Sequence, residues 1–210
     1  MGSAFKNFRP SLHSFQQSYG SYIKADLNLS KKLRRQLLKG QNTKIFGISW
    51  KGGSIKNCAP TNKSIKISEV AEALNDKKIQ LVNLQYGDTT QEIRDLKTEY
   101  GILISDPPEV DNLNNIDGFA ALINACDHVV TIDNLTVHMA GALGVQTSVL
   151  LPFSPEWRWG KTSNDSYIHS SLELYRKRII ENWDIPLKEL RGNLSNLVST
   201  KEPGQTRLKV

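Results

Sequence analysis

The sequence predicts an α/β protein built on a doubly wound parallel sheet. Short apolar segments alternate with longer helical ones along most of the chain, a pattern that produces βαβ units. The apolar segments are nearly continuous runs, as expected for strands covered by helices on both faces. The predicted strands are 44–50, 79–85, 101–105, 128–132, 147–151 and 172–176.

Helix signals separate these strands. Ser30 is the expected N-cap and Gly40 the expected stop of a basic helix over 31–39. Thr89 and Glu92 have the spacing of a capping box for a helix that ends near Tyr100. The remaining predicted helices are 68–75, 117–126, 135–143 and 186–198.

The elements divide the chain into one domain with two flanking segments. Residues 1–40 are expected to form an N-terminal arm and a linker helix, and 41–200 a Rossmann-like domain. Residues 201–210 read as a tail.

Composition narrows the class of protein. The hydrophobic content of 39% and charged content of 23% are ordinary for a folded domain. No apolar run is long enough for a transmembrane segment, and the first residues do not look like a signal peptide. We therefore expect a cytoplasmic protein, with peripheral attachment to the inner membrane left open. Cys58 and Cys126 are far apart in sequence, which favours reduced thiols over a zinc site.

The net charge of +6 suits an anionic partner. At helical spacing the basic cluster wraps around its helix and forms no single stripe, so a solvated helix is favoured over a nucleic-acid surface. That cluster comprises Lys31, Lys32, Arg34, Arg35 and Lys39.

The strongest chemical signal follows the strand 128–132, where a helix begins at once after Asp133. The backbone N–H groups of Asn134, Leu135 and Thr136 are expected to point into the crevice at the strand ends and bind phosphate. Gly141 and Gly144 would let this helix pack closely and then stop. The alternative is that Asp133 is only an N-cap and His138 a packed core histidine.

Lys51, Gly52 and Gly53 occupy the equivalent position after another strand. Glycines let backbone amides approach a ligand and Lys51 could reach a phosphate, although such a triplet is usually only a turn. The sequence has neither a Walker A loop nor a Gly-x-Gly-x-x-Gly fingerprint, which disfavours a dinucleotide oxidoreductase. It also lacks Asp-x-Asp, so we expect no metal and no cofactor.

Several segments occur together in a recognisable order. In its segments and their order, the chain resembles the C-terminal domain of the heptosyltransferase-like glycosyltransferases of family nine. The segments that carry the resemblance are 46–53, 84–88, 119–130, 133–144 and 150–159. The bacterial members fused to tetratricopeptide repeats are the most similar. The likeness runs from about Tyr22 to about Val198. It implies a GT-B fold of two facing Rossmann-like domains, with the donor nucleotide in the C-terminal one.

The resemblance also implies roles for particular residues. The donor phosphates would lie beside 133–136 and under the loop 50–53. Lys63 stands where relatives have an arginine, and Asn134 where they have threonine or serine. The base or ribose would lie near Gln85 and Tyr86, with Asp117 facing the same pocket. The implied donor-binding residues are Trp50, Lys51, Gly52, Gly53, Lys63, Gln85, Tyr86, Asp117, Asp133, Asn134, Leu135, Thr136 and His138.

The expected function is metal-independent transfer of a sugar from a nucleoside-diphosphate sugar to an acceptor. Its catalytic residues are unknown. The general base is expected outside this chain, in an N-terminal acceptor domain or a separate chain, and His138 is the candidate within it. Two alternatives stay open: a non-catalytic nucleotide-binding module or truncated half-enzyme, and a nucleic-acid-binding protein. Trp157-Arg158-Trp159 is either a packed surface plug with a cation–π contact or a wall of the cleft.

Overall fold

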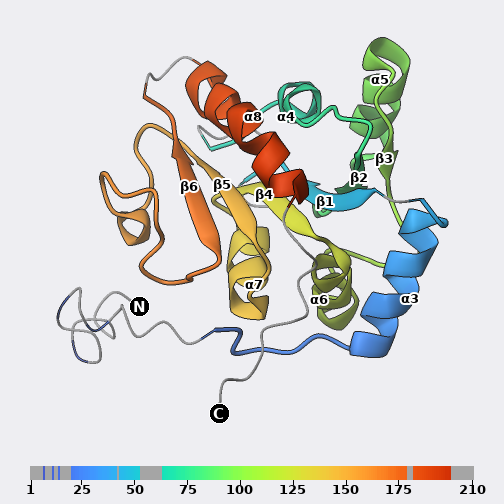
Figure 1. Ribbon diagram of the computed structural model, residues 1–210, viewed down its shortest axis with the longest axis horizontal. Coiled ribbons are helices and arrows are strands. Elements are labelled where there is room, and N and C mark those ends of the chain that lie inside the picture. Colours follow the sequence, from blue (N-terminus) through green and yellow to red (C-terminus); the bar gives the residue numbers. More distant parts are fainter. Residues whose placement is uncertain are drawn as a thin grey trace.

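The computed structural model describes Asn7, Ser11, Ser14 and residues 20–41, 43–52, 63–178 and 182–199. In these residues six parallel strands form one sheet in the order β3-β2-β1-β4-β5-β6 (Figure 1). This confirms the predicted doubly wound α/β fold. The strands are β1 (Lys44–Ser49), β2 (Ile79–Asn83), β3 (Ile104–Ser105), β4 (His128–Ile132), β5 (Thr147–Leu151) and β6 (Leu172–Arg176).

Helices cover both faces of the sheet (Figure 1). One layer contains α4, α5 and α8, and the other contains α3, α6 and α7. Their bounds are α3 (Leu27–Leu38), α4 (Ile67–Ala73), α5 (Thr90–Tyr100), α6 (Ile116–Ala125), α7 (Leu135–Leu143) and α8 (Asp184–Ser199). A short 3₁₀ helix, η1 (Trp157–Trp159), follows β5.

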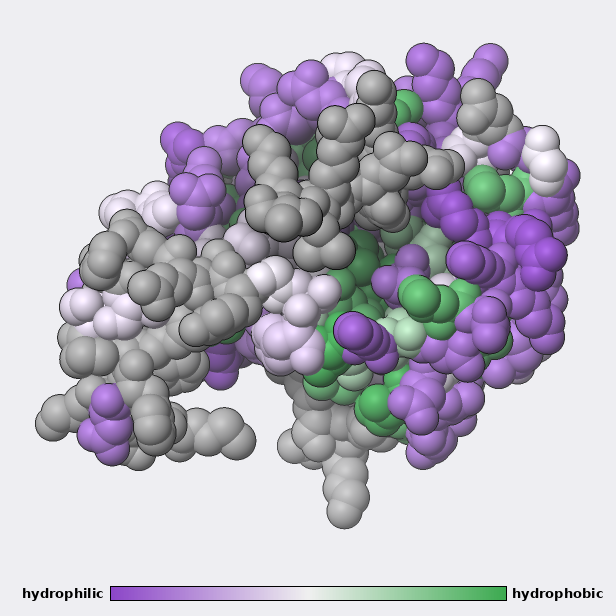
Figure 2. Space-filling view, turned by 60° about the horizontal axis from the view of Figure 1, so that its bottom comes forward, coloured by the Kyte–Doolittle hydropathy of each residue, from purple (hydrophilic) through white to green (hydrophobic). Residues whose placement is uncertain are grey.

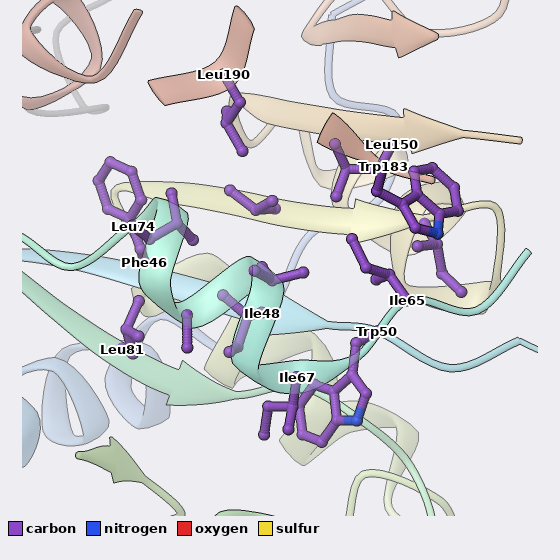
Figure 3. Packing of buried hydrophobic residues seen from close by; sticks show 14 of the residues in the cluster. Phe46, Ile48, Trp50, Ile65, Ile67, Leu74, Leu81, Leu150, Trp183 and Leu190 are labelled. Carbon is purple, nitrogen blue, oxygen red and sulfur yellow. The ribbon is translucent and has the colours of Figure 1, made fainter. Parts of the chain in front are cut away.

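Alternation along β1 shows how one strand serves both layers. Phe46 and Ile48 point toward the helix layer of α4 and α8. Figure 3 shows both side chains together with Leu190 of α8. Ile45 belongs to the cluster on the opposite face. Gly47 also serves that face, since a Cβ there would lie 2.3 Å from the Leu84 side chain. The strand is therefore buried on both sides, as its continuous apolar sequence predicts.

The start of α3 differs from the prediction. The helix begins at Leu27 because the Asp26 carboxylate accepts hydrogen bonds from the N–H groups of Asn28 and Leu29. Ser30, the predicted N-cap, lies inside the helix and donates its hydroxyl to the Asp26 carbonyl at 2.7 Å. The helix is packed into the domain through its buried Leu33, rather than standing apart as a linker.

The predicted capping box of α5 is also wrong. Thr89 is the N-cap residue, but its hydroxyl accepts a hydrogen bond from Asn83 and caps no helix N–H. The Glu92 carboxylate pairs with Lys51 instead of returning to the N-cap. Tertiary partners at the strand ends have therefore replaced the local capping bonds. In the same region β3 has two residues where five were predicted.

The surface on the side of α3, α6 and α7 is mainly hydrophilic. Figure 2 turns the lower side of Figure 1 toward the reader and shows hydrophobic residues gathered in a hollow near the middle. Within the described ranges, no helix has the length and apolar character needed to cross a membrane.

Candidate functional site

The candidate site lies where the direction of winding reverses. β1 and β4 are neighbours, with Ser49 beside Thr131, yet α4 and α7 follow them on opposite faces of the sheet. Such a switch point leaves a crevice beyond the carboxyl ends of the two strands, where α/β proteins bind ligands. Lys51 and Gly52 enter this crevice from β1, and Asp133 enters it from β4.

Four charged side chains meet at Asp133. Its carboxylate, almost wholly buried, lies 3.0 Å from the Lys63 ammonium and 3.5 Å from the Arg158 guanidinium. Lys63 also pairs with Glu156 at 3.0 Å. We call these residues, Lys63, Asp133, Glu156 and Arg158, the Asp133 cluster. The two cations are each about 30% exposed, so they can reach a bound ligand.

The charges of this cluster balance without a ligand. Partial burial, the largest single influence, lowers the pKa of Lys63. The hydrogen bonds and charges of Asp133 and Glu156 outweigh it and raise that pKa above the ordinary value. Lys63 is therefore a firmly charged ammonium. An arriving anion would compete with Glu156, which is more exposed than Asp133.

The N-terminus of α7 is less open than expected. Asn134, and not Asp133, is the N-cap, and its side chain accepts the N–H of Thr136 at 3.0 Å. The N–H of Asn134 itself donates to the Ile132 carbonyl at 2.9 Å. Two of the three amides predicted to face a phosphate thus have internal partners. Leu135, whose N–H forms no hydrogen bond with the described residues, is 50% exposed.

Gln85 organises the chain after β1. Its buried side-chain amide oxygen accepts hydrogen bonds from the Ser49 hydroxyl, the Trp50 N–H and the Lys51 N–H at 3.0, 2.9 and 2.7 Å. Trp50 is fully buried in the core of Figure 3. Both side chains fix the path of the loop, and their contact with a donor stays a prediction.

Lys51 is held apart from the Asp133 cluster. Its ammonium pairs with Glu92 of α5, which also accepts a hydrogen bond from the Trp50 indole at 3.4 Å. Gly52 does approach the cluster, because a Cβ there would lie 3.6 Å from Lys63 Cβ and 3.7 Å from the Asp133 carbonyl. Gly53 lies outside the described residues.

Tyr86 and Asp117 lie on neighbouring segments. Partial burial raises the pKa of the half-buried Tyr86. Asp117 is exposed in the first turn of α6. Within the described ranges Asp117 forms no ion pair with Lys63 or Arg158. Their contribution to a nucleotide pocket stays a prediction.

His138 is part of an aromatic stack. Its ring lies 5.6 Å from Trp159 and 6.1 Å from His169. Burial, with the positive charge of Arg158 next, lowers the pKa of His138, and the charge of Asp133 offsets part of this. The packed-histidine alternative thus describes its surroundings better than a catalytic role does. The tryptophans of 157–159 differ, since Trp159 is buried while Trp157 is 60% exposed.

No sequence pattern indicates Glu156, Arg158 or Glu92 as a site residue. Arg158 stood inside a noted motif, but its pairing with Asp133 depends on how the loop after β5 folds back. The capping-box pattern predicts that Glu92 bonds within its own helix and contacts no other element. Only the strand order brings these side chains beside residues of β1 and β4.

Fold and crevice together define a Rossmann-like protein with a basic and acidic cluster at its switch point. The chain has a heptosyltransferase-like fold, as the sequence predicted. It is similar to Escherichia coli ADP-heptose LPS heptosyltransferase II, with a TM-score of 0.55 and 18% identity over 84% of this chain. E. coli heptosyltransferase WaaC, solved with ADP, gives a TM-score of 0.50 and 13% identity over 87% of this chain.

The chain spans about half the length of these structures, 53% and 50% respectively. Among curated sequences it is 31% identical over 162 residues to protein FlbA of Caulobacter vibrioides, which covers 76% of this chain and 26% of FlbA. No protein-family model matches the sequence.

Proposed function

We propose that this chain binds the diphosphate of a nucleoside-diphosphate sugar at the Asp133 cluster and supplies the donor site of a glycosyltransferase. The observation that carries the proposal is the meeting of Lys63 and Arg158 at the switch point, next to the N-terminus of α7. Positive groups fixed where a diphosphate departs stabilise the charge that develops there.

The proposed binding step exchanges one anion for another. The diphosphate would displace the exposed Glu156 from Lys63, while the buried Asp133 keeps both cations in place. The unpaired N–H of Leu135 would add a backbone donor with the favourable end of the helix dipole. The donor would need no metal in this scheme. Acceptor activation is assigned to no residue of this chain.

Calorimetric titration of the protein with ADP, UDP and GDP tests this proposal. ADP is the first choice because the similar WaaC structure contains it. Lys63→Ala should weaken binding about tenfold, the cost of one charge-assisted contact. Lys97→Ala on the exposed face of α5 removes the same charge away from the crevice and should bind as the unchanged protein does. Equal affinities for the two variants would refute the assignment of the site.

A binding module without catalysis is the second candidate. It is favoured by the position of His138, whose ring is stacked on Trp159 and lies near the tilted ring of His169. Such a module would bind a nucleoside diphosphate as above and would not hydrolyse or transfer the sugar of a bound donor. Donor turnover followed by chromatography separates the two functions.

A nucleic-acid-binding function has one specific observation in its favour. Of the basic residues on α3, Arg34 turns inward and binds Asp127, while Lys31, Lys32 and Arg35 are exposed. Lys39 lies just beyond the last residue of the helix and is also exposed. Filter binding at two salt concentrations tests this function, since phosphate contacts give a steep salt dependence.

A further inference from the structure

A second cavity lies at the other end of the sheet from the Asp133 cluster. Its volume is about 340 Å³, within the range of small-molecule sites. The end of α3, the start of β1, Lys78 before β2 and the end of α8 line it. The length of β1, about 20 Å at the usual rise per residue, separates it from the crevice beyond Ser49.

Three cations line this cavity, and among the described residues one carboxylate, that of Asp127, pairs with two of them. Arg34 binds Asp127 through both of its terminal nitrogens, at 2.9 and 3.0 Å, and Lys44 lies 3.5 Å from the same carboxylate. Asp127 also accepts the Ile45 N–H at 2.8 Å, so its oxygens are fully used. Lys78 forms no ion pair with the described residues. The hollow therefore holds an excess of two positive charges.

The nearby acid Asp76 does not remove this excess. Its carboxylate accepts the backbone N–H of Lys78 at 2.7 Å and is not part of the lining. Arg34 is additionally fixed by donating to the Ala125 carbonyl at 2.9 Å. The cationic groups are thus partly preorganised, which lowers the cost of binding an anion.

The rest of the lining indicates what kind of anion fits. Thr43 lines the cavity, and its buried hydroxyl has no hydrogen-bond partner among the described residues. Leu38 and Val198 supply an apolar part of the wall. We propose that this cavity binds a small phosphorylated metabolite, whose dianionic phosphate matches the two excess charges. The site is independent of the proposed donor site.

Backbone amide NMR with inorganic phosphate, and then with a phosphate monoester carrying an apolar group, tests the proposal. Both ligands should shift the amide signals of Thr43 and Lys44, and the monoester should also shift that of Val198. The monoester should bind more tightly. The amide signals of Gly52 and Leu135 report on the crevice at the Asp133 cluster. Binding in the cavity and binding in the crevice are therefore distinguished from each other.

Lys78→Gln and Lys77→Gln form a matched pair, because both residues are exposed but only Lys78 lines the cavity. Lys78→Gln should weaken phosphate binding at the cavity about fivefold, as expected for a partly exposed charged contact. Lys77→Gln should leave it unchanged. An absence of shifts at Thr43 and Lys44, or the same affinity in both variants, would overturn the proposal. In that event Arg34 and Lys44 serve only to bind Asp127.

Discussion

The ammonium of Lys63 lies 3.0 Å from Glu156, the same distance that separates it from Asp133. The two carboxylates differ in exposure, since the Asp133 side chain is 3% exposed and that of Glu156 is 43% exposed. Asp133 is therefore a fixed partner that orients the lysine. Glu156 occupies the position that an anionic ligand would take.

Glu156→Gln should strengthen binding of ADP about threefold, since a partly exposed ion pair is worth less than about 1 kcal/mol. The variant removes both a competitor for Lys63 and a charge that repels the diphosphate. Calorimetric titration at constant salt measures the change. Glu99→Gln on the exposed face of α5 alters the net charge equally and should have no effect. Weaker binding by Glu156→Gln would show that Glu156 helps to hold the ligand.

Local sequence patterns predicted the bounds of four elements in the second half of the chain. β4, α7, β5 and β6 have the predicted bounds, because continuous apolar runs end at Asp133, Gly144 and similar breaks. Gly144 caps α7 with φ 74°, as its sequence position indicates. The start of α3 was missed because Asp26 and Ser30 are both good N-cap residues and the local pattern does not rank them.

The strand-end positions of Asp133 and Lys51 were predictable from the sequence, and the contacts of their side chains were not. Sequence order alone placed Asp133 and Lys51 at the strand ends, since parallel strands share one carboxyl edge. It could not show that Lys51 pairs with Glu92 or that Gln85 binds the loop from beneath. Those contacts depend on side chains from elements that are distant in sequence and adjacent only in the folded sheet.

Gly141→Ala should destabilise the protein by about 1–3 kcal/mol, the usual range for overpacked core sites. A Cβ at this position would lie 2.4 Å from the His169 ring and 2.8 Å from Leu172. Gly192→Ala in α8 is the matched control, because nothing lies within 4 Å of its added Cβ. It should stabilise the protein by about 0.5–1 kcal/mol through helix propensity. Urea unfolding measures both, and equal effects would contradict the close packing of α7 against His169.

Stability should fall as the pH drops from about 6.5 to about 4. Burial lowers the pKa of His128 to about 4, although the charge of Asp127 opposes the shift. In this range the unfolded chain takes up a proton that the native ring does not, so the free energy of unfolding decreases with falling pH. The loss from His128 is about 2–3 kcal/mol and should end below about pH 4.

Comparison with His128→Gln separates this contribution from those of the carboxylates and of His169. Burial and the charge of His138 also lower the pKa of His169 to about 4. Urea unfolding at several pH values should give a shallower pH dependence for the variant than for the unchanged protein. The ring-proton NMR shifts of His128 supply a direct readout that does not depend on folding of the variant. His128 Nε2 and Ser148 Oγ lie 2.9 Å apart in the neutral state. If the His128 ring of the native protein titrated near pH 6.5, the ring would be open to solvent. That result would contradict its buried position beside Phe46.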